Sequence, residues 1–170
     1  MNHIKSVDIN IHKLTPEDDV ESFDCGDKDL NEFIRDDALK QMNAKINVTY
    51  LCGYKRQTIG FFTLSADSIK INTDDLEGFK CKDIPYREFP AIKIGRLGVC
   101  KPYQSRGVAT NLILLIVGRA FKLSECIGLR YVSVDAYTDL VGFYEKRYFT
   151  EFIHDGNRRT VQMYLDILKL

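Results

Sequence analysis

The alternation of apolar and polar side chains marks the strands of this chain. Residues 7–14 alternate in this way, which predicts a half-buried strand. Two apolar-rich runs on either side of Lys55-Arg56-Gln57 predict an antiparallel hairpin. The complete set of predicted strands is 7–14, 47–54, 58–71, 91–100, 130–137, 149–153 and 161–167.

Helical periodicity marks the segments between these strands. Residues 27–43 place Leu30, Ile34 and Ala38 on one face, which predicts an amphipathic helix. Thr15-Pro16 is followed by acids, so a further helix is predicted to begin there. An apolar stripe predicts a helix over 105–124, and a short helix is predicted over 139–147.

The order of these elements predicts a mixed α/β (α+β) sheet in one domain that spans residues 1–170. Residues 72–90 are irregular and polar. A loop of that length inside a compact domain favours a functional segment.

Composition excludes several classes of protein. Hydrophobic residues make up 45% and charged residues 28% of the chain, the balance of a globular domain rather than a disordered one. The formal net charge of zero excludes a uniformly basic nucleic-acid-binding protein. No apolar run approaches the roughly 20 residues that span a bilayer, and no secretory signal is visible at the start. We therefore expect a cytoplasmic protein with no membrane partner.

The charge is unevenly distributed along the chain. Residues 17–37 contain ten acids and two bases, so this segment has a net charge of −8 and the remainder has +8. Much of the basic excess lies in residues 80–106, which hold seven bases and two acids. Either the acids form an ordinary solvated face, or an anionic ligand binds the basic part.

The five cysteines are widely spaced and form no CxxC pair, so no metal site is predicted. Cys52 and Cys100 lie in apolar runs and are expected to be buried, unreactive thiols. No histidine lies near any cysteine in sequence, so a catalytic thiol would lack a neighbouring base.

A candidate anion site lies where the strand at 91–100 leads into the helix predicted to start at Ser105. The start of a helix carries unpaired N–H groups and a partial positive charge. Gly107 lets the backbone approach a ligand closely, and Arg106 adds a full charge and several donors. These features predict a pyrophosphate cradle that is neither a Walker A loop nor a GxGxxG dinucleotide site. An ordinary strand–helix turn is the alternative.

Three ordered motifs resemble the Gcn5-related N-acetyltransferases. Residues 104–109 (QSRGVA) fit the Q/R-x-x-G-x-G/A pattern of that family, and the preceding RLGV resembles its fourth strand. Residues 131–136 resemble its fifth strand, and residues 143–149 resemble its FYxKxGF helix end, with Tyr148 in place of glycine. The resemblance covers about residues 46–167. It implies a mixed sheet of about six to seven strands, flanked by about four helices and splayed between strands four and five.

The resemblance also implies that acetyl-CoA lies in the splayed opening, with no metal. The backbone of Leu97 and Val99 would pair with the pantetheine arm, and an N–H near Leu97 or Gly98 would polarise the thioester carbonyl. The implied cofactor-binding residues are Leu97, Gly98, Val99, Gln104, Ser105, Arg106, Gly107, Val108, Ala109, Thr110 and Phe143.

Two residues are implied to act in catalysis. Tyr144 aligns with a tyrosine that protonates the departing thiolate, and a phenol with a pKa of ~10 suits that role. The alternative for Tyr144 is packing beside Phe143. Asp135 is a candidate for removing a proton from the incoming ammonium through water, and its alternative is a strand-end hydrogen-bond acceptor. The reaction would be a direct transfer.

Two more segments resemble one group of this family. Residues 23–33 resemble the FDCGxxxLxxFL opening of toxins that acetylate the amino group of aminoacyl-tRNA, and residues 60–66 resemble their GYYTLSA strand. The predicted function is therefore acetyl transfer from acetyl-CoA to a primary amine, that of charged tRNA. The alternatives are a small amine, peptide or protein as acceptor, or a non-catalytic acyl-CoA-binding domain.

The same resemblance implies a ribbon-helix-helix antitoxin as a partner. The C-terminal strand at 161–167 would either pair across a homodimer or lie inside the sheet of its own chain.

Overall fold

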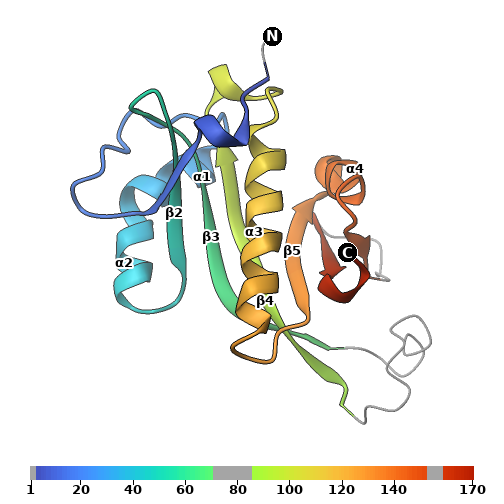
Figure 1. Ribbon diagram of the computed structural model, residues 1–170. Coiled ribbons are helices and arrows are strands. Elements are labelled where there is room, and N and C mark those ends of the chain that lie inside the picture. The colour runs from blue at the N-terminus through green and yellow to red at the C-terminus, as the bar shows by residue number, and fades with distance from the viewer. Residues whose placement is uncertain (1–2, 71–85, 153–158) are drawn as a thin grey trace. The chain divides into compact units, whose positions relative to one another are not determined.

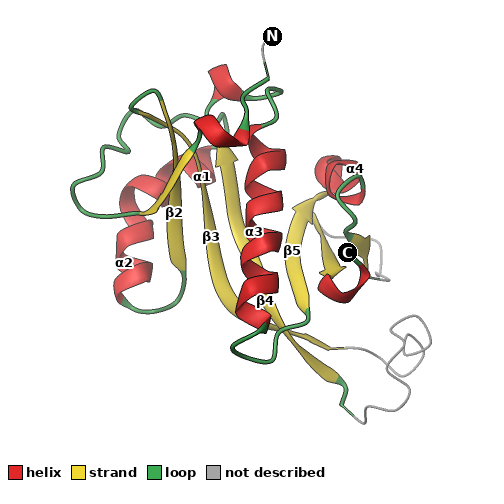
Figure 2. Cartoon of the chain, in the orientation of Figure 1, coloured by secondary structure: helices red, strands yellow, loops and turns green. Residues whose placement is uncertain are grey.

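The computed structural model describes residues 3–70, 86–152 and 159–170 (Figure 1). Most of the irregular segment at 72–90 lies outside the described residues, as does the turn expected at 155–157. The strands are β1 (Asn10–Lys13), β2 (Val48–Tyr54), β3 (Gln57–Lys70), β4 (Glu88–Val99), β5 (Tyr131–Tyr137), β6 (Thr150–Glu151) and β7 (Thr160–Asp166). The α-helices are α1 (Lys28–Glu32), α2 (Ala38–Asn43), α3 (Val108–Ser124) and α4 (Val141–Glu145). Figure 2 shows these helices and strands by type.

Contacts divide the chain into two compact units. Unit 1 comprises residues 1–65 and 94–116, and unit 2 comprises residues 66–93 and 117–170. The strand order is β1-β2-β3-β4-β5-β7-β6, so the predicted mixed α/β fold with six to seven strands is confirmed. The prediction of one domain over residues 1–170 stays a prediction.

Unit 1 is built on the antiparallel pairs β1–β2 and β2–β3. The predicted hairpin is confirmed, and φ is positive at both Lys55 and Arg56 (48° and 64°), as in two-residue turns that match the twist of the strands.

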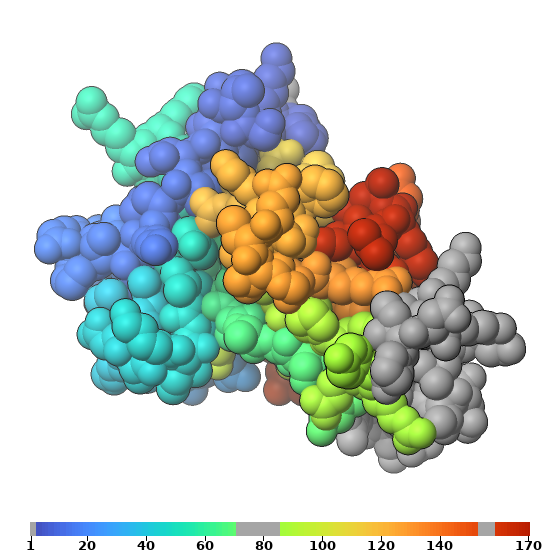
Figure 3. Space-filling view, turned by 60° about the horizontal axis from the view of Figure 1, so that its bottom comes forward, coloured from blue at the N-terminus to red at the C-terminus, as the bar shows by residue number. Residues whose placement is uncertain are grey.

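The helical segment predicted over 27–43 is confirmed, with a π-helical turn at Phe33–Asp37 between α1 and α2. Asp27 caps it by accepting a hydrogen bond from the Leu30 N–H at 3.1 Å. Phe33 is buried and stacks on Phe61 of β3, with 6.0 Å between the ring centroids. The segment therefore covers the sheet with its apolar face, while its other side lies on the surface, seen in cyan in Figure 3.

Two predicted helix starts are wrong. No helix begins at Thr15-Pro16, because the Asp18 carboxylate accepts hydrogen bonds from both the N–H and the hydroxyl of Thr15 and closes a turn there. α3 begins at Val108 rather than at Ser105, because Ser105 and Gly107 have positive φ values that an α-helix excludes.

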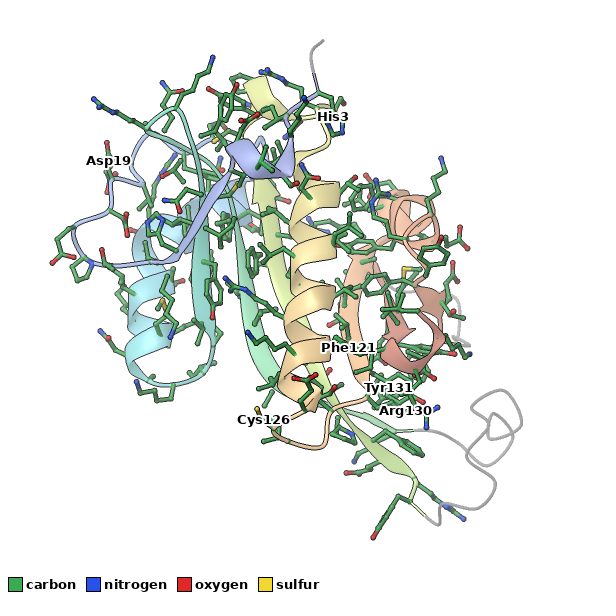
Figure 4. All side chains as sticks on the ribbon, viewed as in Figure 1. His3, Asp19, Phe121, Cys126, Arg130 and Tyr131 are labelled. Carbon is green, nitrogen blue, oxygen red and sulfur yellow. The ribbon has the colours of Figure 1, made fainter. Side chains whose placement is uncertain are left out.

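Unit 2 contains β5, β7 and β6, which pair antiparallel in that order. Its core is aromatic: Tyr131 is fully buried and makes edge contacts with Phe89 and Tyr164 at 6.0 and 5.7 Å between centroids. Arg130, labelled beside Tyr131 in Figure 4, pairs with the buried carboxylate of Asp166 at 2.9 Å. β7 thus lies inside the sheet of its own chain, and the homodimer stays a prediction.

Candidate functional site

The loop between β4 and α3, in unit 1, carries the predicted anion site. The predicted cradle residues are Gln104, Ser105, Arg106 and Gly107 in a turn, followed by Val108, Ala109 and Thr110 in the first turn of α3. φ is +56° at Ser105 and +83° at Gly107, but is not positive at Arg106 between them. Alternation of this kind turns successive N–H groups toward one side and makes an anion-binding nest.

Free backbone donors gather in this nest. Within the part of the chain that the structure describes, the N–H groups of Ser105, Gly107, Val108 and Ala109 have no hydrogen-bond acceptor. Unpaired donors of this kind at the start of a 17-residue helix favour an anion, because the helix dipole adds a partial positive charge there. The arrangement is suited to a phosphate or diphosphate group.

Gln104 has a different role in the loop from that of the free donors. Its side-chain amide donates to the carbonyls of Cys25 and Val99 at 2.8 and 2.9 Å, and its own N–H donates to the Lys101 carbonyl at 3.3 Å. Gln104 therefore fixes the start of the nest to neighbouring backbone, and its N–H already has an acceptor.

Asp24 fixes the same loop from the N-terminal side. Its carboxylate accepts hydrogen bonds from the Lys101 ammonium at 2.8 Å, the Asn31 amide at 2.9 Å and the Gly26 N–H at 2.8 Å. Hydrogen bonding to Lys101 is the main cause that lowers the pKa of Asp24 to about 2. The segment at 23–33, which resembles the opening of the acetylating toxins, thus supports the nest.

Gly107 is in contact with the N-terminal segment. A Cβ built on Gly107 would lie 2.0 Å from Nε2 and 2.5 Å from Cε1 of His3, so the imidazole stands where a side chain would be. This is a second reason for glycine, beside the positive φ. No sequence pattern points to His3, because it lies about a hundred positions from Gly107.

The predicted pantetheine-binding strand residues lie at the end of β4 in unit 1. Gly98 is buried, and a Cβ there would lie 2.9 Å from Phe61 Cε1 and 3.3 Å from Phe23 Cζ, so its glycine allows packing of the core. Leu97 is half-buried, and the carbonyl of Val99 is the one that binds Gln104.

Tyr144 lies in α4 of unit 2, and the residue is 5% exposed. It makes edge contacts with Phe143 and Phe149 at 5.2 and 5.3 Å between centroids. Burial raises the pKa of Tyr144 to about 12, although Arg147 acts in the opposite direction. Its hydroxyl has no hydrogen-bond partner among the described residues, and its oxygen is not fully buried. The side chain therefore combines a packed ring with a protonated hydroxyl that can donate.

Phe143, a predicted cofactor-binding residue, also lies in α4. The Arg147 guanidinium stands over its ring, with 3.6 Å from the central carbon to the ring centroid. The ring is therefore covered on one face.

Asp135 lies near the end of β5 and is paired with Lys93 of β4, with 2.6 Å between Oδ2 and Nζ. Two residues earlier on the same strand face, the buried Ser133 hydroxyl donates to the Asp67 carboxylate. The geometry thus gives Asp135 an accessible carboxylate that is 44% exposed and already oriented by an ammonium group.

The two cysteines in apolar runs are poorly suited to chemistry. Cys52 and Cys100 are buried as predicted, and burial raises the pKa of Cys52 to about 12. No cluster of three metal-ligating side chains occurs in the described ranges. None of the described helices is long and apolar enough to cross a membrane.

Comparisons place the chain among known proteins. No family model matches it. It is 30% identical to the tRNA-acetylating toxin of Mycobacterium tuberculosis over 130 residues, which are 75% of this chain and 75% of that protein.

Two solved structures show the same fold. AtaT complexed with acetyl-methionyl-tRNAfMet has a TM-score of 0.79 at 24% identity, over 91% of this chain and 94% of that one. A tyrosine-to-phenylalanine variant of AtaT, bound to acetyl-CoA and to the C-terminus of the antitoxin AtaR, has a TM-score of 0.78 at 20% identity. That match covers 95% of each chain.

Proposed function

The chain belongs to the tRNA-acetylating toxins of the Gcn5-related N-acetyltransferases, and from this premise we propose that it acetylates the α-amino group of aminoacyl-tRNA with acetyl-CoA. The observation that carries the proposal is the nest before α3, with its four free N–H groups. A diphosphate is the part of acetyl-CoA that such a nest binds.

The local geometry supports the following cofactor roles. The N–H groups of Ser105, Gly107, Val108 and Ala109 hold the diphosphate, with Arg106 and Thr110 at the edge of the nest. Leu97, Gly98 and Val99 supply backbone groups to the pantetheine arm, and Phe143 contacts the cofactor from α4. Gln104 acts on the cofactor indirectly, by fixing the loop that carries the free donors.

The transfer is a single displacement. The neutral amine nitrogen attacks the acetyl carbonyl carbon, the carbon–sulfur bond breaks, and the thiolate takes the proton of the Tyr144 hydroxyl. Before the attack, the ammonium proton of the acceptor passes through water to Asp135. The proton that the nitrogen loses as the amide forms then restores the Tyr144 hydroxyl. Tyr144 suits its role because it stays protonated at neutral pH.

The low pKa of an α-amino group favours it over a lysine side chain as the acceptor. An α-amino group has a pKa of about 7.7–8.0, against about 10.4 for a lysine side chain, so far more of it is neutral near pH 7. A carboxylate such as Asp135, which is oriented by its ion pair with Lys93, is sufficient for such an amine.

Incubation with charged tRNA and labelled acetyl-CoA tests the acceptor. We expect label on aminoacyl-tRNA and none on the same tRNA after deacylation. Free amino acids and a lysine-containing peptide serve as competing acceptors in separate reactions. Label only on one of these would remove tRNA as the acceptor but keep the acetyltransferase, whereas cofactor binding with no transfer at all would contradict catalysis.

Asp135→Asn tests the route of the amine proton. We expect kcat/KM for charged tRNA to fall about tenfold at pH 7 and clearly less at pH 9, where the acceptor amine is already neutral. Glu151→Gln, on β6, removes an exposed carboxylate in the same unit and should have no effect. A loss of equal size at both pH values would assign Asp135 to hydrogen bonding alone.

The proposed partners and location follow the family. A ribbon-helix-helix antitoxin would hold the protein inactive, and AtaT bound to the C-terminus of AtaR is the related complex. Acetyl-CoA and charged tRNA are cytoplasmic, so we infer that the protein acts in the cytoplasm.

A further inference from the structure

Residues 3–4 run along the loop that forms the nest. The Ile4 N–H donates to the Arg106 carbonyl at 3.0 Å, and the Asn111 side-chain amide donates to the Ile4 carbonyl at 2.9 Å. Ile4 is 2% exposed, so its side chain is buried as well. The N-terminal segment is thus fixed to both the turn before α3 and the first turns of α3 by two hydrogen bonds and one apolar anchor.

This anchoring sets the position of the preceding residue. His3 is labelled in Figure 4 beside the start of α3, and its Nε2 lies 2.0 Å from where a Cβ on Gly107 would stand. The imidazole is therefore in contact with Gly107, whose N–H is one of the free donors of the nest.

The ring nitrogens of His3 are available for hydrogen bonding to a ligand. Its side chain is exposed, and neither ring nitrogen has a hydrogen-bond partner among the described residues. Ile4 and Asn111 already fix the segment without the imidazole. An unpaired imidazole at the edge of a group of anion-binding N–H groups has one donor when neutral and two when protonated.

We propose that His3 is a further ligand of the acetyl-CoA diphosphate, donating a hydrogen bond from its imidazole to a phosphate oxygen held by the nest. The inference rests on the proposed function, because it requires the diphosphate at residues 105–109. A hydrogen bond to a charged phosphate oxygen is stronger than one between neutral groups. The N-terminal segment would then be part of the cofactor site.

Calorimetry with two ligands tests the role of His3. S-acetylpantetheine carries the same thioester and arm as acetyl-CoA but has no diphosphate. For His3→Ala we expect about tenfold weaker binding of acetyl-CoA and unchanged binding of S-acetylpantetheine. His3→Gln keeps a side-chain N–H and should recover part of the loss, and Ser6→Ala removes an exposed polar group from the same segment without effect.

Each other outcome contradicts the proposal. Unchanged acetyl-CoA affinity in His3→Ala would mean that the imidazole makes no contact with the diphosphate. Tighter binding would mean that the imidazole obstructs the nest. Equal weakening for both ligands would assign His3 to supporting the loop rather than to binding phosphate.

Ala109→Pro separates this inference from the proposed function. It removes one free N–H in the first turn of α3, where proline is tolerated, and leaves His3 in place. If Ala109→Pro weakens acetyl-CoA binding but His3→Ala does not, the nest holds the diphosphate and only the role of His3 is wrong. If neither variant changes acetyl-CoA affinity, the assignment of the nest fails too.

Discussion

Replacing Tyr144 with phenylalanine should lower turnover by about 10²-fold or more while acetyl-CoA affinity stays the same. The variant loses one hydroxyl and keeps the ring that packs between Phe143 and Phe149, so the fold should be unaffected. The leaving thiolate then lacks its proton donor. Steady-state kinetics with charged tRNA, together with calorimetry for acetyl-CoA, measure the two quantities separately.

The pKa of Tyr144 gives the pH range in which this acid works. Burial raises the pKa to about 12, above the ordinary tyrosine value of ~10, because it disfavours the phenolate. The hydroxyl is therefore protonated throughout pH 6–10, and turnover should not decline in that range through its ionisation. The same shift lowers the free energy of unfolding as the pH rises from about 10 toward 12, where the unfolded chain ionises first.

Tyr148→Phe is the matched control for Tyr144→Phe. Tyr148 follows α4 and is 79% exposed, and the substitution removes the same hydroxyl group as in Tyr144→Phe. Equal turnover in Tyr144→Phe and the parent protein would remove Tyr144 as the general acid. A large loss in Tyr148→Phe would show that the assay responds to local changes around α4 rather than to the acid.

Gly107→Val should weaken acetyl-CoA binding by about 10²-fold with the fold retained. Two causes act together: φ is +83° at Gly107, which a β-branched residue rarely adopts, and the new Cβ would meet the His3 imidazole. The backbone must shift to relieve the strain at residue 107 and the clash with the imidazole. Such a shift changes the alternating φ values that turn the N–H groups toward the diphosphate. Calorimetry gives the affinity, and circular dichroism with thermal unfolding reports on the fold.

Gly118→Val is the control for this substitution. Gly118 lies in α3, and a Cβ there would meet nothing within 4 Å, so the added side chain has space. We expect acetyl-CoA affinity to be retained, with a small effect on helix stability. Unchanged affinity in Gly107→Val itself would place the diphosphate elsewhere.

The elements of the fold were predictable where periodicity and local turn chemistry agree. The hairpin around Lys55-Arg56 and the amphipathic segment at 28–43 are examples. The start of α3 was not, because Ser105 adopts a left-handed conformation that residue type does not indicate. Thr15-Pro16 resembled a helix start, but the Asp18 carboxylate closes a turn on Thr15 instead.

Only the part of the site formed by consecutive residues was predictable from the sequence. Gln104 to Thr110 are contiguous, so a motif identifies them. The contacts that support them join distant positions: Asp24 reaches Lys101, and His3 reaches Gly107. Such pairs depend on how the chain folds back on itself. The ion pair of Lys93 with Asp135 is of the same kind, since Lys93 lies on another strand.

The contact between His3 and Gly107 also affects how the protein is prepared. An affinity tag fused shortly before His3 would place foreign residues next to an imidazole that touches the loop before α3. Histidine tags would add further imidazoles and, with them, competing donors for phosphate. A tag placed after the 3₁₀ turn at Ile167–Lys169 leaves the residues around His3 in unit 1 unchanged.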